Sequence, residues 1–299
     1  MRTFRIPFNA MASGCEVVLA ANDEQQAASL AQAAMDEVHR VETRFSRYRP
    51  DSIVARINAA AGQEPVVCDD ETWALLEYAD ALYRSSDGLF DITSGVLRRA
   101  WDFKVPRVPS TAELDPVRRL IGWSRVERDN RRVRLPEAGM ELDFGGFGKE
   151  YAADRAGAIL LAQGVQHGYV NLAGDMRILG PKPDGEPWKI GIQDPRHKGQ
   201  ILATIPVWQG GLATSGDYER FFELDGQRYC HVLDPRTGQP VTWWRTVSVQ
   251  APLAVVAGNC TTMAMLKQSE GLAFLEASGM NYLAVDRHGA IHVKDNSKP

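Results

Sequence analysis

The stretch LATSGDYERFFELDGQRYCHVL, residues 212–233, runs directly into DPRTG at residues 234–238 and holds the densest set of reactive side chains in the chain. Small residues at 214–216 form a turn, and apolar runs over 219–224 and 227–233 predict a hairpin. His231 ends the second strand, three residues before Asp234, which could orient its ring. Histidine exchanges protons near neutral pH. This density of groups indicates an enzyme site rather than a structural hairpin.

The pattern around this hairpin predicts a mixed fold. Apolar residues at helical spacing indicate helices over 24–45, 53–60, 70–86, 112–120, 149–163, 253–266 and 270–278. Shorter runs indicate strands or hairpins over 4–20, 140–144, 167–172, 188–193, 203–207, 211–214, 246–251, 281–285 and 290–293, and a hairpin through Asp129-Asn130. Strands outnumber helices. We therefore expect an α/β (α+β) class with a largely antiparallel sheet, as one domain or two closely packed lobes.

Composition excludes several classes of protein. The 34 basic and 38 acidic residues give a net charge of −4, so no electrostatic surface for nucleic acid is expected. There is no apolar run of transmembrane length and no basic amphipathic stretch for a membrane surface. The four cysteines are widely spaced without a CxxC motif, which indicates neither a zinc site nor a disulfide framework. This usage fits a reducing compartment, and we expect a cytoplasmic location.

Two glycine turns have the form of ligand-binding segments. Residues 143–149, DFGGFGK, lead from a predicted strand into a helix, where free N–H groups and Lys149 suit a phosphate or pyrophosphate. The alternative is a tight packing turn. Residues 171–175, NLAGD, end in Asp175, which either binds a cation or ribose hydroxyl or caps its own turn. No GxGxxG follows a strand and no P-loop is present.

These segments together resemble the ApbE family, flavin transferases that move FMN from FAD onto a threonine or serine of an acceptor protein. The resemblance covers nearly all of residues 1–299, as a single ApbE-like domain with two intimately packed lobes. Several separate motifs occur in the family's order, which makes the resemblance specific. They are residues 10–13 (AMAS), 46–52 (SRYRPDS), 87–93 (DGLFDIT), 143–154 (DFGGFGKEYAAD), 170–175 (VNLAGD), 214–218 (TSGDY) and 231–238 (HVLDPRTG).

The resemblance implies a T-fold-like, two-lobed architecture with FAD bound between the lobes. It implies a Mg²⁺-dependent phosphoryl transfer that cleaves the pyrophosphate of FAD and releases AMP. His231 matches the family's general base, which activates the acceptor hydroxyl. The residues assigned to the FAD site are Met11, Tyr48, Asp91, Lys149, Asp175, Asp217 and Asp234. The acceptor is expected to be a separate protein, because the chain contains no copy of the family's acceptor signature.

One departure from the family concerns the metal. The family usually has an Asp and a Thr four residues apart on one helical face, and here Thr262 is kept while the Asp is replaced by Gly258. Asn259 points about 100° away and cannot substitute. Mg²⁺ prefers at least one carboxylate. Glu150, where the family more often has a small residue, is the candidate replacement, and the implied ligands are Thr262, Gly146 and Glu150. Asp143, Asp175 and Asp217 are rivals for the carboxylate.

Three functions remain open on the sequence. The first is FAD:protein FMN transfer. The second is an FAD pyrophosphatase that releases FMN and AMP, with water in place of the acceptor. The third is an FAD-binding protein that has lost its metal and its activity; Gly258 favours it, and the retained His231 and DPRTG loop argue against it.

Overall fold

The computed structural model describes residues 1–296 and is built around one large antiparallel sheet. Within these residues the sheet has eight strands in the order β1-β2-β6-β7-β10-β13-β14-β15, and each strand runs antiparallel to its neighbours. The predicted class, α/β (α+β) with a largely antiparallel sheet, is confirmed. The strands are β1 Arg2–Ala10, β2 Ser13–Ala21, β6 Gly168–Leu172, β7 Asp175–Gly180, β10 Gly210–Gly216, β13 Trp244–Ala251, β14 Asn281–Asp286 and β15 Ile291–Lys294.

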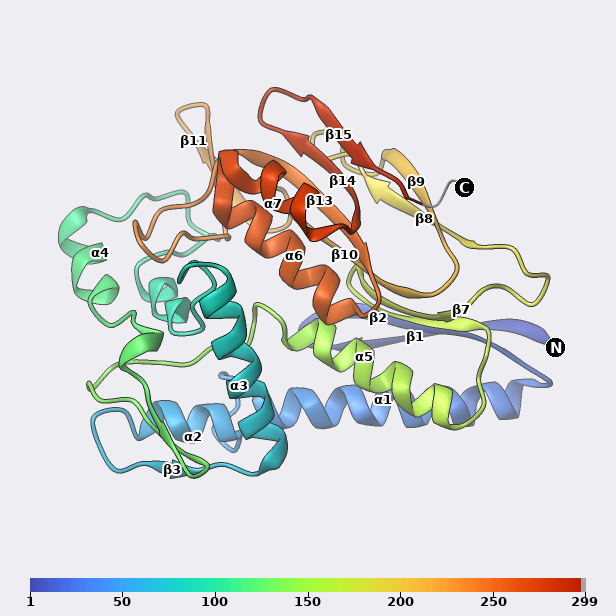
Figure 1. Cartoon of the computed structure of the whole chain (residues 1–299), viewed down its shortest axis with the longest axis horizontal. Coiled ribbons are helices and arrows are strands. Elements are labelled where there is room, and N and C mark those ends of the chain that lie inside the picture. Colours follow the sequence, from blue (N-terminus) through green and yellow to red (C-terminus); the bar gives the residue numbers. More distant parts are fainter. Residues whose placement is uncertain (297–299) are drawn as a thin grey trace.

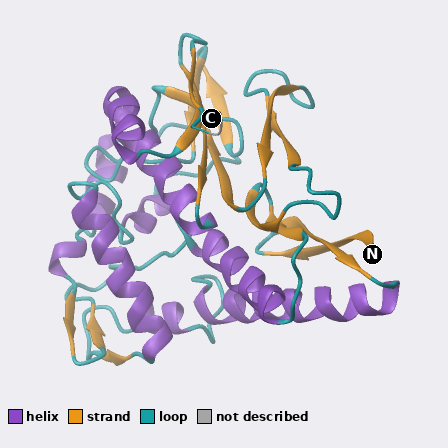
Figure 2. Cartoon of the chain, turned by 45° about the vertical axis from the view of Figure 1, so that its right-hand side comes forward, coloured by secondary structure: helices purple, strands orange, loops and turns teal. Residues whose placement is uncertain are grey.

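Three long helices cover one face of this sheet: α1 (Glu24–Phe45), α5 (Gly148–Ala162) and α6 (Ala254–Lys267). Figure 1 shows α1 and α5 beneath the sheet and α6 crossing above them. Helix α7 (Gly271–Ser278) follows after a short 3₁₀ turn, η3 (Gln268–Glu270), and packs on α6. In the turned view of Figure 2 most helices lie at the left and along the bottom, most strands lie toward the top and right, and a few short strands lie at the lower left.

The opposite face of the sheet is covered in part by a separate hairpin, β8 (Trp188–Gln193) with β9 (Ile201–Val207). Alternation along the strands divides their side chains between the two faces. On β7, Met176 and Ile178 pack with the hairpin in one apolar cluster, whereas Leu179 belongs to the core beneath the helices. Asp175 lies four positions before Leu179 on β7, so its side chain points to the same face of the sheet, toward the helices.

The remaining segments lie at one end of the helical layer. They include the hairpin of β11 (Phe221–Leu224) and β12 (Gln227–Cys230) and a small sheet in the order β3-β5-β4. Figure 1 shows β3 at the bottom of the molecule and α4 above it at the left edge. The elements are α2 (Ile53–Ala59), β3 (Val66–Val67), α3 (Asp70–Ser85), η1 (Ser94–Arg99), α4 (Thr111–Arg118), η2 (Trp123–Arg125), β4 (Glu127–Asp129) and β5 (Arg132–Arg134).

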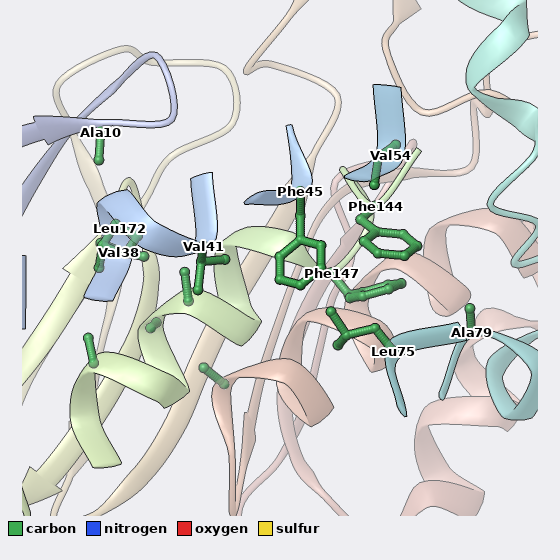
Figure 3. Close-up of a cluster of buried hydrophobic side chains, with 14 of the residues drawn as sticks. Ala10, Val38, Val41, Phe45, Val54, Leu75, Ala79, Phe144, Phe147 and Leu172 are labelled. Atoms are coloured by element: carbon green, nitrogen blue, oxygen red, sulfur yellow. The ribbon is translucent and has the colours of Figure 1, made fainter. Parts of the chain in front are cut away.

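Local sequence accounts for the helices directly. The side chain of Asp23 accepts a hydrogen bond from the Gln26 backbone N–H at 2.8 Å and starts α1. Its buried residues recur every three or four positions (Ala27, Ala31, Ala34, Val38, Val41 and Phe45). Figure 3 shows Phe45 meeting Phe144 and Phe147, with Val54 of α2 and Leu75 of α3 close by. These residues join α1, α2, α3 and the glycine turn into one core.

Several strand predictions differ from the structure: β3 was not expected, and β10 continues through Gly216, where a turn was predicted over 214–216. The strand expected over 140–144 is wrong: the segment is extended but joins no sheet. Its backbone is satisfied elsewhere, because the Asn58 side-chain amide bonds both the N–H and the C=O of Leu142, and the Asp143 N–H donates to the Ile92 carbonyl. Strand β7 was not expected, since the segment after residue 175 was interpreted only as a turn.

Candidate functional site

The glycine turn before α5 is held rigidly by its two phenylalanines. The rings of Phe144 and Phe147 are both buried, with centroids 5.1 Å apart. The Asp143 side chain accepts a hydrogen bond from the Gly145 N–H at 2.8 Å, and Arg47 pairs with the same carboxylate. A Cβ on Gly146 would lie 2.9 Å from the Phe90 ring, so the position suits glycine. The turn therefore fixes the start of α5 and the residues of its first turn.

Three charged residues meet behind this turn. The Lys149 ammonium forms an ion pair with the carboxylate of Asp175, which is only 5% exposed. Glu150 is also buried, and its Oε2 has no hydrogen-bond partner among the described residues. Burial, reinforced by the negative charge of Asp175, raises the pKa of Glu150 to about 8. Lys149, Glu150 and Asp175 were all expected at the site, and the structure brings them together.

Helices α5 and α6 pack antiparallel, and their contacts place Gly258 of α6 against Glu150 of α5. The Asp154 carboxylate accepts hydrogen bonds from the Ala254 and Val255 N–H groups, at 3.0 and 2.9 Å. One turn away, a Cβ built on Gly258 would lie 2.4 Å from Glu150 Oε1. The carboxyl of Glu150 thus occupies the space in which a side chain at 258 would begin.

The neighbours of Gly258 on α6 face in different directions. Thr262 lies one further turn along the same face as Gly258. The buried Asn259 instead donates a hydrogen bond to the Tyr78 hydroxyl, so its amide serves the contact with α3. This agrees with the expectation that Asn259 cannot substitute for a side chain at 258.

His231 follows β12 directly, and its backbone N–H donates to the Arg220 carbonyl at 3.0 Å. Its ring Nδ1 is buried and has no hydrogen-bond partner within the described chain. Burial lowers the pKa of His231 to about 4, and the positive charges of Arg98 and Arg220, with that of Lys149, act in the same direction. The imidazole is therefore neutral at neutral pH, and its Nδ1 is left without a hydrogen-bond partner in the described residues.

Asp234 does not orient the histidine ring, contrary to the expectation from the sequence. Its carboxylate accepts from the Arg236 backbone N–H at 2.8 Å and pairs with the Arg236 guanidinium, while its carbonyl accepts from the Gly238 N–H at 2.7 Å. The Trp101 indole N–H donates to the Gly238 carbonyl at 2.8 Å. These bonds make DPRTG a fixed loop, because the aspartate is used to close it.

Two other predicted aspartates are also engaged by the protein itself. Asp217 forms two 2.7 Å hydrogen bonds with the Arg196 guanidinium. Asp91 is buried and accepts from the Thr93 backbone N–H, the Thr93 hydroxyl and the Trp123 N–H at 2.6–3.0 Å. Both carboxylates therefore hold loops around the site.

Met11 and Tyr48 lie near the C-terminal end of α1. Met11 is in the β1–β2 turn with φ +51°, and its N–H donates to Glu42 at 2.9 Å. A cavity of about 460 Å³ is lined there by residues 9–14 and Glu42. Tyr48 is 73% exposed, with the Arg47 guanidinium over its ring.

The sequence did not identify Arg98 or Arg220 as site residues. Both act electrostatically on His231, and neither has an ion pair in the part of the chain that the structure describes. Arg98 lies 133 positions before the histidine in the chain. No local pattern could have shown this proximity, although Arg220 lies on the hairpin that precedes His231.

No group of three or more His, Cys, Asp or Glu side chains with metal-binding geometry occurs among residues 1–296. Over the same residues, no helix combines the length and apolar character needed to cross a membrane.

Comparison with known proteins agrees with this architecture. The model of the ApbE family matches residues 11–284. A Treponema pallidum protein named FAD:protein FMN transferase is 34% identical over 253 residues, covering 77% of this chain and 70% of that protein. A Vibrio cholerae protein of the same name is 30% identical over 255 residues, covering 82% and 75%.

Solved structures give the same result. The crystal structure of the ApbE protein from Thermotoga maritima superposes with a TM-score of 0.89 at 32% identity, covering 98% of this chain and 97% of that one. The apo form of the flavinyl transferase ApbE from Pseudomonas stutzeri gives 0.86 at 30% identity, with 98% and 95% covered. The curated relatives and a matching solved structure are flavin transferases, so the eight-stranded antiparallel sheet with helices on one face places this chain in a class of transferase enzymes. The chain belongs to the ApbE family.

Proposed function

We propose that this protein transfers FMN from FAD to a threonine or serine hydroxyl of a separate acceptor protein and releases AMP. The observation that carries the proposal is the environment of His231. A neutral imidazole with an unpartnered nitrogen lies within the electrostatic reach of three cations, Arg98, Arg220 and Lys149. The neutral imidazole is the form that can accept a proton, and the three cations suit an anionic phosphoryl group bound beside it.

In the proposed reaction the acceptor hydroxyl oxygen attacks the phosphorus atom of the FMN half of FAD. A new oxygen–phosphorus bond forms, and the bond from that phosphorus to the bridging oxygen breaks, so the electron pair leaves with AMP. His231 accepts the hydroxyl proton. The charge on the phosphoryl oxygens is stabilised by nearby cations, the role that arginine and lysine side chains take in other phosphoryl transfers.

The chain's residues also fit a magnesium ion. We propose Glu150, Thr262 and the Gly146 carbonyl as its ligands, a set of hard oxygen donors. The fit rests on Glu150, whose buried Oε2 lacks a partner and whose carboxyl fills the space over Gly258. When bound, Mg²⁺ would neutralise charge on the pyrophosphate.

The assignment of the FAD site remains a proposal for each residue. Lys149 and Met11, which lies beside a cavity, are proposed as direct contacts of FAD, and Asp175 is proposed to act through the Lys149 ammonium, with which it forms an ion pair. Asp91, Asp217 and Asp234 are proposed to shape the site from behind, because their carboxylates already bind protein groups. Tyr48 is exposed and free to cover a ligand. The cytoplasmic location stays a prediction.

The proposal is tested by incubating the protein with FAD and Mg²⁺ or EDTA, with and without a flavin-acceptor domain. The transferase predicts AMP only in the presence of acceptor, together with covalent flavin on it. AMP and free FMN without acceptor would indicate a pyrophosphatase. Bound but intact FAD under all conditions would indicate a flavin-binding protein.

Replacing His231 by Gln tests the base. We expect at least a 100-fold loss in the rate of transfer with little change in FAD affinity, because the imidazole acts on the acceptor proton. Phe221→Leu, on the neighbouring strand, is the control for disturbance of the hairpin. Transfer at the wild-type rate by His231→Gln would exclude the histidine as base.

Glu150→Gln tests the metal site. The amide keeps the size of the side chain and removes the charge, so Mg²⁺ affinity measured by calorimetry and Mg²⁺-dependent turnover are both expected to be lost, while FAD binding persists. Glu219→Gln, an exposed carboxylate close enough to influence Lys149, is the matched control. Unchanged Mg²⁺ affinity in Glu150→Gln would remove Glu150 from the ligand set.

A further inference from the structure

Positive charge is concentrated in one segment of this acidic protein. Residues 98–134 contain 11 basic and five acidic residues, against 23 basic and 33 acidic in the rest of the chain. Most of these arginines form ion pairs, but Arg98, Arg119 and Arg132 have none in the described part of the chain. The pairs are Arg99–Glu141, Arg107–Glu113, Arg118–Asp115, Arg125–Glu137, Arg128–Asp80, Arg131–Asp70 and Arg134–Glu127.

Helix α4 presents part of this charge on one face. Leu114 is buried against Trp101 and Phe222 in a small apolar cluster. Asp115, Arg118 and Arg119 follow at spacings that place them together on the outward side. The helix is fixed at its start by a capping box between Ser110 and Glu113. The outward side chains are therefore displayed from a rigid element.

This face meets the loop that follows the catalytic histidine. The Arg118 guanidinium donates to the Arg236 carbonyl at 2.5 Å. Between α4 and the loop lies a cavity of about 380 Å³, lined by Arg118, Arg119, Ile121, Pro235 and Arg236, with Asp115 as its one carboxylate. The side chain of Arg236 is 62% exposed. We call these six residues the arginine cavity. Arg236 of this cavity lies five residues after His231 in the chain, and Arg98 and Arg220 act electrostatically on that histidine.

We infer that the arginine cavity is the docking surface for the acceptor protein, which binds through an acidic segment near its reactive hydroxyl. This inference rests on the proposed function, because it places the partner beside the base that activates that hydroxyl. Charge complementarity carries it: Arg118 pairs with Asp115 and Arg236 pairs with Asp234, whereas the exposed Arg119 has no ion pair in the described part of the chain. The cavity therefore offers an uncompensated guanidinium in a chain that is otherwise acidic. Arginine binds carboxylates in bidentate geometry, and such complementarity raises association rates and fixes register.

The test uses full-length protein and fluorescein-labelled 15-residue peptides with one central threonine and four flanking Glu, Gln or Lys residues. Fluorescence anisotropy is measured at 50 and 300 mM KCl. We expect the Glu peptide to bind at least 10-fold more tightly than the Gln peptide at low salt, with the difference mostly lost at high salt. Equal affinity for the Glu and Gln peptides would overturn the inference.

Substitutions inside and outside the arginine cavity show where the Glu peptide binds. Arg119→Glu is expected to weaken the Glu peptide by about 5- to 10-fold, and Asp115→Asn to strengthen it by about twofold, because it removes the one carboxylate. Arg132→Glu makes the same charge change in the small sheet below α4 and is expected to leave affinity unchanged (Figure 1). Thermal unfolding verifies that each variant is folded. Equal losses of affinity for the Glu peptide in Arg119→Glu and Arg132→Glu would show that only the net charge of the protein matters, and would contradict the inference.

FAD kinetics separate this surface from the dinucleotide site. The KM for FAD of Arg119→Glu is expected to equal that of the wild type. A raised KM for FAD with unchanged peptide affinity would assign the cavity to the phosphates of FAD and overturn the inference. The two proposals fail independently: FAD cleavage without peptide binding removes only the docking surface, while peptide binding without any FAD cleavage removes the transferase.

Discussion

At the scale of single residues, the close packing of Glu150 against Gly258 is the most specific feature of the site. The glutamate side chain needs the volume that a side chain on α6 would otherwise fill, and the glycine leaves that volume open. The proposal that Glu150 supplies the metal carboxylate in place of a residue at 258 rests on this contact. The two positions are therefore expected to be coupled energetically, because they share one space.

Gly258→Asp should reveal this coupling. Its Cβ would lie 2.4 Å from Glu150 Oε1 and would bring a second carboxylate beside a buried one, so we expect a loss of about 1–3 kcal/mol in the free energy of unfolding. The double variant Glu150→Ala/Gly258→Asp should recover most of this loss. Urea denaturation of the two single variants and the double variant measures the coupling, and additive losses would contradict it.

The pKa of His231 predicts a pH dependence of stability. The folded-state pKa of about 4 lies below the unfolded value of 6.5, so the unfolded chain binds more protons between these values. The stability that His231 contributes is complete above pH 6.5 and is lost as the pH falls toward 4. We expect wild type to lose about 1–2 kcal/mol more than His231→Gln between pH 7 and 5. Equal losses would contradict the shift, and NMR titration of the imidazole measures it directly.

At the scale of elements, α6 starts on a residue of another helix. Leu253 supplies no side-chain cap, and the first N–H groups of α6 are bonded by Asp154 of α5. This contact sets the register that places residue 258 against 150. The sequence predicted both helices, from their apolar spacing, to within one or two residues at their ends. It could not show that one caps the other.

Asp154→Ala should destabilise the protein by about 1–2 kcal/mol, because two N–H groups lose their acceptor. It should also lower Mg²⁺ affinity, since the register of Gly258 and Thr262 against Glu150 loosens. The control is Asp23→Ala, an exposed cap on α1 that lies far along the chain from these ligands. Urea denaturation and calorimetry measure both effects, and full Mg²⁺ affinity in Asp154→Ala would separate the cap from the metal site.

At the scale of the whole molecule, one core joins the parts. The largest apolar cluster contains residues of α1, α2, α3 and α5 together with Ala254 and Met263 of α6. No element of this set can lose its packing without exposing the others. The expectation of one domain, residues 1–299, rests on this sharing and stays a prediction.

Calorimetry tests whether residues 1–299 unfold as one domain. We expect one unfolding transition whose calorimetric and van't Hoff enthalpies agree, because the shared core couples the lobes. Trp188→Ala, in the cluster beneath the β8–β9 hairpin, should lower the Tm without splitting the transition. Two resolved transitions in the wild-type protein would show that the lobes fold separately.

The sequence alone determined the helices and most strands, because their apolar periodicity is local, and the glycine turns, because their residues specify backbone conformation. It also singled out His231, Lys149, Glu150 and Asp175. The tertiary structure decided their partners. Asp234 closes its own loop, Asp217 pairs with Arg196, and Arg98 reaches the histidine from 133 residues away. The Asn58 side chain accepts a hydrogen bond from the backbone of residue 142, where a neighbouring strand would otherwise do so. Such contacts depend on how distant segments pack together, and no pattern within a single segment encodes them.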